Sequence, residues 1–151
     1  FSNRIRKSGA RIKFLLNAVV YHRRRTSLKQ FFKQVFNWGV ARINLGKIDT
    51  KMLEPIHFLQ ALATLIGGGI FVAFLYFGYP VIYFFELCAI PLVLLSVLGT
   101  IKKKDVRIFP LLLIVIPAQI VGYALGFMLN FIKRFILQQD SWTGFKKKYY
   151  E

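Results

Sequence analysis

The chain has 151 residues, of which 56% are hydrophobic, and it carries 22 lysine and arginine residues against 6 aspartate and glutamate residues. This apolar fraction excludes a disordered basic tail, and a net charge of +16 is unlike that of an ordinary soluble domain. The two properties occupy different segments: residues 55–100 contain no lysine or arginine, and residues 108–132 contain no formal charge. Uncharged apolar runs of about 18 residues or more are typical of membrane spans. The sequence therefore predicts a mainly α membrane protein.

Residue counts exclude several kinds of site. A single cysteine, Cys88, allows no internal disulfide bond, and with two histidines it cannot build a structural zinc site. The sequence contains neither a P-loop nor a Gly-x-Ser-x-Gly elbow. The basic residues flank the apolar runs, where they suit lipid headgroups better than nucleic acid. We therefore expect membrane lipid, and no nucleic acid, as a partner.

Residues 1–26 have the pattern of a helix–turn–strand unit at the end of an α/β domain. Residues 2–8 are typical of the last turns of a helix with Gly9 as its C-cap, and residues 19–21 favour a strand. So few residues cannot form a sheet alone. The chain also opens at Phe1 without a start methionine or a signal pattern, so we expect further chain upstream.

Residues 27–54 are expected to form an amphipathic helix and a polar link. Ser27 can cap the helix, the helix itself covers 28–45, and Gly46 ends it. The apolar face holds Leu28, Phe31, Phe32, Val35, Phe36, Gly39 and Ile43. The opposite face holds Lys29, Lys33, Asn37 and Asn44. Large aromatic residues opposite lysines predict a helix in the membrane interface, and the alternative is a helix packed on a soluble core.

A transmembrane bundle of three spans is predicted within residues 55–132. The predicted spans cover residues 55–77, 81–100 and 108–132. Three consecutive glycines at 67–69 predict that a neighbouring helix approaches the first span closely. Residues 78–80 predict a tight turn before the second span, and Pro91 predicts a kink within it.

The distribution of charge predicts the topology of the first two spans. Residues 1–54 hold 13 basic groups, the loop at 102–107 holds 4, and the turn at 78–80 holds none. The positive-inside rule therefore places the N-terminal part and this loop in the cytoplasm and the turn outside.

The basic aromatic tail, residues 133–151, conflicts with this topology. Three full spans place the tail outside with its 5 basic groups, whereas a re-entrant third segment, broken near Pro117 or Gly122, would keep it inside. We expect three spans, because 25 uncharged residues are enough to cross and a hairpin would leave unpaired backbone groups in the membrane.

Residues 2–45 resemble the end of the catalytic domain of family 2 glycosyltransferases. The resemblance rests on Arg4 to Gly9, on the stretch VYHRRR at 20–25, and on Gln34 to Trp38 (QVFNW). Within that family the chain is most similar to membrane transferases of the succinoglycan type. Residues 122–127 (GYALGF) also resemble an element in the last span of that subgroup.

The resemblance implies a function in polysaccharide biosynthesis. It implies that residues 1–26 are a remnant of a GT-A type α/β domain, and that a sugar passes from a nucleotide-sugar donor to a lipid-linked or polysaccharide acceptor. The expected location is a bacterial inner membrane, with the N-terminal part cytoplasmic. The alternative is a small, non-enzymatic basic membrane anchor or subunit that binds anionic lipid and a protein partner.

The resemblance also implies a divalent metal ion, Mg²⁺ or Mn²⁺, held by an Asp-x-Asp motif. Neither this motif nor the family's Glu-Asp base occurs in the chain. We therefore expect no catalytic residue in this fragment and no activity of the fragment alone, so whether the chain is part of an enzyme stays open at this point.

Candidate acceptor- or donor-binding residues lie on the amphipathic helix: Gln34, Asn37, Trp38 and Arg42. Gln34, Trp38 and Arg42 follow one another at intervals of four residues and share a ridge. An indole can cover the apolar face of a sugar while amides bind its hydroxyl groups. In the processive synthases of the family the motif is Gln-x-x-Arg-Trp, and Asn37 replaces its arginine here. The alternative role of Trp38 is an interfacial anchor.

A second group of candidates lies just before this helix. Arg23, Arg24 and Arg25 are candidates for binding a diphosphate, because guanidinium groups bond bidentately to phosphate oxygens. His22 is a candidate metal ligand. The alternative for the three arginines is a patch that binds lipid headgroups.

Overall fold

The computed structural model describes residues 5, 8, 9, 11, 13, 17–21 and 27–145, and within 27–145 the regular structure is helical throughout. The elements in chain order are α2 (Leu28–Ile48), η1 (Thr50–Met52), α3 (Ile56–Tyr76), α4 (Val81–Lys103), η2 (Val106–Ile108), α5 (Phe109–Phe131) and the π-helical turn η3 (Ile132–Ile136). The helices α3 and α4, and the continuous segment from η2 to η3 that contains α5, are long and apolar enough to cross a membrane.

The described part of the chain contains no strand. Residues 19–21, which favour a strand by composition, lie outside regular structure. A strand needs a partner for its backbone N–H and C=O groups, and the described residues supply none. The structure therefore does not show the predicted remnant of a GT-A type domain. Gly9 does adopt the left-handed conformation expected of a C-cap, with φ +79°.

The amphipathic helix α2 begins where it was predicted to begin and ends later. The side chain of Ser27 accepts a hydrogen bond from the backbone N–H of Gln30 at 3.2 Å, as an N-cap does. Gly46 was predicted to end the helix, but it lies inside it and is buried. A Cβ atom at Gly46 would lie 3.0 Å from Cβ of Leu53, so this glycine makes room for the link that follows and does not terminate α2.

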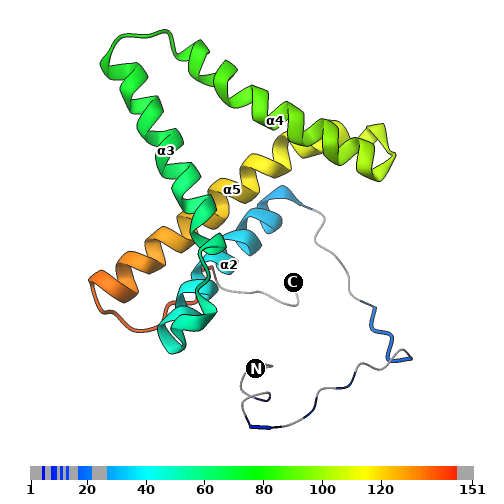
Figure 1. The fold of residues 1–151 in the computed structure, drawn as a ribbon, viewed down its shortest axis with the longest axis vertical. Coiled ribbons are helices and arrows are strands. Elements are labelled where there is room, and N and C mark those ends of the chain that lie inside the picture. The colour runs from blue at the N-terminus through cyan, green and yellow to red at the C-terminus, as the bar shows by residue number, and fades with distance from the viewer. Residues whose placement is uncertain are drawn as a thin grey trace.

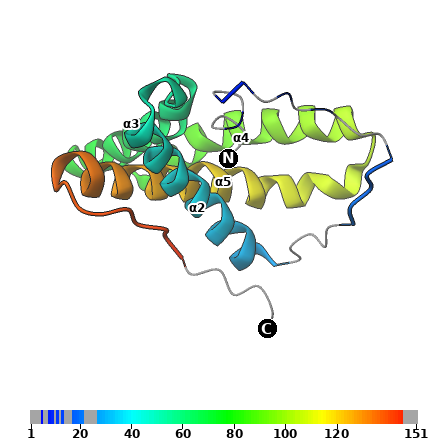
Figure 2. The ribbon, with the colours of Figure 1, turned by 90° about the horizontal axis from the view of Figure 1, so that it is seen from below.

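The apolar face of α2 packs on α5, and the two helices run in the same general direction (Figure 1) and cross at an oblique angle (Figure 2). Glycines at the contact let the backbones approach closely. A Cβ atom at Gly126 would overlap the backbone of Phe36, and one at Gly39 would overlap the backbone of Tyr123. Further toward the start of α2, a Cβ atom at Gly122 would lie 3.1 Å from the ring of Phe32. The face that was predicted to meet the membrane interface is thus covered by a helix of the same chain.

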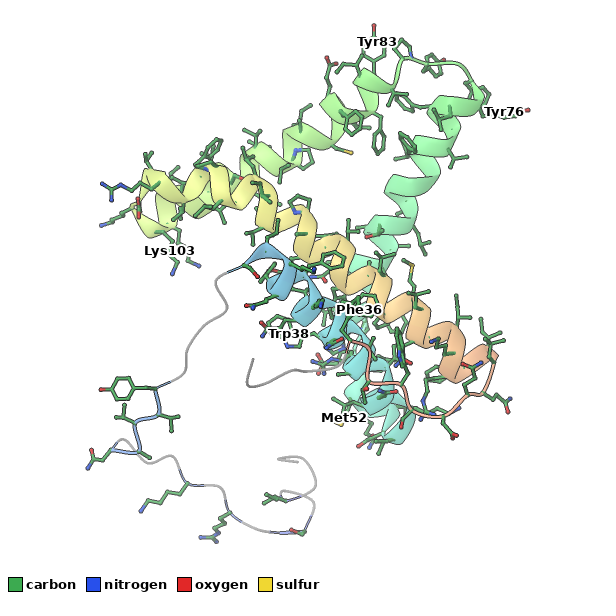
Figure 3. All side chains as sticks on the ribbon, turned by 180° about the vertical axis from the view of Figure 1, so that it is seen from behind. Phe36, Trp38, Met52, Tyr76, Tyr83 and Lys103 are labelled. Carbon is green, nitrogen blue, oxygen red and sulfur yellow. The ribbon has the colours of Figure 1, made fainter. Side chains whose placement is uncertain are left out.

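The helices α3, α4 and α5 form the three sides of a triangle (Figure 1). Near its start, α3 meets α5 where the rings of Phe58 and Phe127 stack edge to face, 5.0 Å between centroids. Near its end, α3 meets α4 through Phe71 and Phe84, also at 5.0 Å. The third corner is the contact of the last turns of α4 with the first turns of α5, where Ser96 of α4 is fully buried. Figure 3 shows Tyr76 and Tyr83 at one corner and Lys103 at another.

The connections between these helices agree only in part with the predictions. The turn at 78–80 is present, with Gly78 at φ +71°. By contrast, a Cβ atom at any of the three glycines at 67–69 would meet nothing within 4 Å, so the predicted close neighbour is not provided by the described residues. α4 continues through Pro91, and α5 continues through Pro117 and Gly122. The broken hairpin considered for the third segment is therefore wrong.

Candidate ligand groove

A groove opens where α2 meets the first turns of α3 and the middle of α5. Its volume is about 590 Å³. The polar and aromatic residues that line it are Trp38, Arg42, His57, Gln60 and Tyr123. Two consecutive helices, α2 and α3, and the distant helix α5 therefore contribute to one site, which lies beside the corner where α3 crosses α5.

Trp38 and Arg42 form the α2 wall of the groove. They lie one turn apart and therefore project from the same side of the helix. The side chain of Trp38 is 52% exposed, which leaves its ring available for contact. The guanidinium of Arg42 is close enough to act electrostatically on both the Tyr123 hydroxyl and the His57 ring. The groove thus combines a flat aromatic surface with a positive charge.

His57 presents a hydrogen-bond donor. Its Nδ1 accepts a hydrogen bond from the backbone N–H of Glu54 at 2.9 Å, which requires Nδ1 to be unprotonated. The neutral ring therefore carries its proton on Nε2, and the Nε2–H group remains free to donate. The hydrogen bond also fixes the orientation of the ring at the start of α3.

Two buried polar atoms of the groove have no hydrogen-bond partner among the described residues. They are Oε1 of Gln60 and the hydroxyl oxygen of Tyr123. A buried polar group without a partner costs about 1–3 kcal/mol. Gln60 and Tyr123 thus add polar groups to the groove wall, and the Tyr123 hydroxyl lies beside the Arg42 guanidinium, so the groove is better suited to a hydroxyl- or phosphate-bearing ligand than to an apolar one.

The four residues predicted on α2 do not all meet. Trp38 and Arg42 are brought together in the groove. Gln34 is partly buried and does not line it. Asn37 lies on the opposite flank of α2, where its amide donates to the Phe145 carbonyl at 2.9 Å and accepts from the Phe145 N–H at 2.8 Å.

His22, Arg23, Arg24 and Arg25 lie outside the described residues. The groove instead includes three residues that were not among the predicted site residues, namely His57, Gln60 and Tyr123. Two of them are polar residues in the first turns of an otherwise uncharged span, which is the signal that points to them. Tyr123 gives no such signal, since aromatic residues are common throughout the chain.

The tail returns along the flank of α2 opposite the groove. Asn44 donates to the Trp142 carbonyl at 2.7 Å, and the ammonium of Lys133 lies 3.9 Å from the centroid of the Trp142 ring. Asn37 and Asn44 were predicted to lie on the face of α2 opposite the apolar residues. Both in fact bind the backbone of the tail, because the tail folds back over the helix after η3.

A buried asparagine connects α5 to this contact. Asn130 is completely buried, and its amide donates to the Val40 carbonyl at 2.8 Å and to Oδ1 of Asn44 at 3.0 Å. A buried amide is stabilised only when it is hydrogen-bonded. Asn130 and Asn44 therefore form a chain of hydrogen bonds that links α5, α2 and the tail.

The divalent ion implied by the resemblance has no site in the part of the chain that the structure describes. No group of three or more His, Cys, Asp or Glu side chains lies close enough together there to hold a metal ion. The described residues therefore do not fit this cofactor.

Comparison with protein-family models, curated proteins and solved structures finds no match for this chain.

Proposed function

We propose that the chain is the membrane part of a family 2 glycosyltransferase and that the groove receives the lipid-linked acceptor. The observation that carries this proposal is the meeting of Trp38 and Arg42 with His57, Gln60 and Tyr123 in one groove. Trp38 belongs to the segment that resembles the family. The other residues extend the site onto two of the apolar helices.

The chemistry of the groove matches an acceptor with a sugar and a phosphate. The indole of Trp38 covers the apolar face of a sugar ring. Arg42 binds a phosphate through charge-assisted hydrogen bonds. Gln60 and Tyr123 add a side-chain amide and a hydroxyl group, which can exchange hydrogen bonds with the sugar hydroxyl groups.

The position of the groove suits a ligand with a lipid tail. Along α3, on either side of the groove residue Gln60 in sequence, leucine and isoleucine side chains including Leu59 and Leu62 are exposed, and an acyl or polyprenyl chain can lie along them. Holding the acceptor beside the membrane raises its effective concentration at the reacting centre. In this proposal the protein works at the cytoplasmic face of a bacterial inner membrane, and residues outside this chain bind the nucleotide-sugar donor and perform the transfer.

A fluorescence titration tests the groove directly. The chain has two tryptophans, so a Trp142→Phe variant reports on Trp38 alone. In lipid nanodiscs, a polyprenyl monophosphate should change the Trp38 emission with a saturable dependence on concentration. Arg42→Gln should weaken binding about tenfold or more, which corresponds to a charge-assisted hydrogen bond of at least about 1.4 kcal/mol.

The controls distinguish this function from the alternative of a lipid anchor. Gln34→Ala changes the same helix outside the groove and should leave the affinity unchanged. Phosphatidylglycerol at the same concentration should produce little change. An equal response to phosphatidylglycerol, with the same dependence on Arg42, would instead favour a non-enzymatic anchor that binds anionic lipid.

A further inference from the structure

We propose that α5 does not cross the membrane but lies along its cytoplasmic leaflet. In this proposal α3 and α4 form a hairpin that spans the membrane, and the start of α3 and the end of α4 pack on α5. In this arrangement α2 covers α5 on the headgroup side, and the exposed face of α5 contacts acyl chains. The partner of this surface is therefore an anionic lipid leaflet. The inference concerns membrane topology and does not depend on the function proposed for the groove.

The first support is the depth of α2. This helix holds four basic residues, and Lys29, Lys33 and Lys47 are exposed. Exposed lysines are costly in the hydrocarbon core, so α2 belongs at the membrane surface. Because α2 contacts α5 from Gly122 to Asn130, that part of α5 lies close to the depth of α2.

The second support is the path of the tail. The side chains of Asn37 and Asn44 hold residues 142 and 145 against α2. The chain that leaves α5 therefore returns to the side of the membrane on which α2 lies. The opposite end of α5 follows the loop at 102–107, which holds 4 basic groups. Both ends of α5 thus adjoin segments that favour the same aqueous side.

The third support is the triangle. The first turns of α3 and the last turns of α4 pack on α5 close to Phe127 and Leu112, respectively. These two positions are separated by 15 residues of helix, or about 22 Å. At their other ends, α3 and α4 contact each other through Phe71 and Phe84, near the turn at 78–80. These two helices have 21 and 23 residues, or about 31 and 34 Å, which matches the roughly 30 Å of a hydrocarbon core.

The distribution of charge agrees with this arrangement. Residues 1–54, 102–107 and 133–151 together hold all 22 lysine and arginine residues, and the turn at 78–80 holds none. With α5 along the leaflet, every basic group lies on one side of the membrane, as the positive-inside rule favours. Each basic residue near the surface also attracts anionic lipid by about 1 kcal/mol. Three full spans would place the basic tail on the opposite side.

The exposed face of α5 suits acyl chains. Exposed apolar side chains recur at helical spacing along α5 and η3, among them Ile114, Val121 and Leu125 in α5 and Ile132 and Ile136 in η3. These residues fall on a single stripe along the helix, and none is polar. The stripe runs the length of α5 and η3, so it can contact one leaflet along its whole length.

Depth measurements test the inference. Nitroxide labels are attached to single cysteines at Ile114, Val121 and Ile136, in a Cys88→Ser background and in vesicles that contain phosphatidylglycerol. The ratio of oxygen to nickel accessibility should give similar, shallow depths at the three positions, and a label at Val72 in α3 should be deeper. A spanning α5 would instead place position 121 about 10 Å deeper than 114 and about 20 Å deeper than 136, and this result would overturn the proposal.

Labelling from one side provides an independent test. Single cysteines at Tyr79, Lys103 and Thr143 are exposed in intact cells to an impermeant thiol reagent. Position 79 should react, and positions 103 and 143 should react only after permeabilisation. Reaction of 143 together with 79 would restore three spans, and reaction of 103 instead of 79 would invert the topology; either outcome contradicts the proposal. Loss of ligand binding in the groove would change none of these results.

Discussion

The asparagines of α2 and α5 show how a polar residue can organise an apolar protein. Asn130 is surrounded by two packed helices, and it uses its amide protons to bond the α2 backbone and the Asn44 side chain. Asn44 then donates its own protons to the tail. Because hydrogen bonds need a particular geometry, these amides fix how α5, α2 and the tail are oriented toward one another, which apolar contacts alone would not do.

Removal of one of these amides should loosen the tail. In a Trp38→Phe background, Trp142 is the only tryptophan, and its quenching by acrylamide reports how well the tail is covered. Asn44→Ala should increase this quenching, because it removes a bond worth about 0.5–1.5 kcal/mol and leaves Asn130 without its side-chain partner. Gln34→Ala, on the same helix but away from the tail, should leave the quenching as it is. Equal quenching in both variants would contradict the assigned role.

Trp38 offers a second prediction at the scale of one residue. On the function proposed above, Trp38→Ala should raise the acceptor KM of glycosyl transfer or lower its turnover by more than about tenfold, which corresponds to about 1.4 kcal/mol. Trp38→Phe should have a smaller effect, because it keeps an aromatic surface. Unchanged glycosyl transfer with weaker membrane association would show that Trp38 is an anchor and not a sugar-binding residue.

At the scale of the elements, glycine spacing decides which helices pack. Gly122 and Gly126 are four residues apart and lie on one side of α5, so they form a shallow surface that receives α2. The glycines at 67–69 are consecutive and therefore point to three different sides of α3. They provide no continuous surface, and the structure places nothing within 4 Å of their Cβ positions.

This difference predicts opposite outcomes for two similar substitutions. Gly126→Leu should force α2 and α5 apart, because even a Cβ atom would overlap the Phe36 backbone. Overpacking of this kind costs about 1–3 kcal/mol or more, so the Tm in detergent should fall by at least about 3 °C. Gly68→Leu has open space and should leave the Tm unchanged or raise it slightly. A similar Tm for both variants would show that the α2–α5 contact contributes little to stability.

Sequence patterns specify the long helices better than their partners. The helices α3, α4 and α5 begin and end within three residues of the predicted bounds, because continuous apolar runs and the turn at 78–80 are local signals. The coverage of α2 by α5 is not local. It depends on Gly39 and Gly126, which are 87 positions apart in the sequence.

In the candidate site, too, local spacing predicts some neighbours but not the contacts between different helices. Trp38 and Arg42 share a helix, so their proximity could be read from their spacing. Their proximity to Gln60 and Tyr123 depends on where α3 crosses α5, which no periodicity encodes. Asn37 was assigned to the same site because it lies in the resembling motif and amides bind sugar hydroxyl groups, but its amide is bonded to the donor and the acceptor of the Phe145 backbone, which are 108 positions away.

At the scale of the whole molecule, the exposed apolar surface requires a membrane. Only 6% of the most apolar part of α3 is buried within the chain, and the same holds for α4. Soluble proteins rarely expose apolar surface of this extent. The chain should therefore remain in the membrane pellet after extraction with alkaline carbonate, in the wild type and in the Gly68→Leu variant alike. Recovery in the soluble fraction without detergent would contradict the membrane assignment.

The two hydrogen bonds between Asn37 and the Phe145 backbone affect which amino-acid substitutions the tail can accept. The carboxamide pairs with the N–H and the carbonyl of Phe145 in the way that a neighbouring strand would, so it recognises main chain and not a side chain. Replacement of Phe145 by most other residues preserves both bonds, whereas proline removes the N–H and with it one of the two. The course of this region also depends on its side chains and on Gly144. The Phe145 ring packs against Phe36 with 4.8 Å between centroids, and a Cβ atom at Gly144, where φ is +76°, would overlap Oδ1 of Asn37. Proline at 145 and any larger residue at 144 are therefore the substitutions that it should not tolerate.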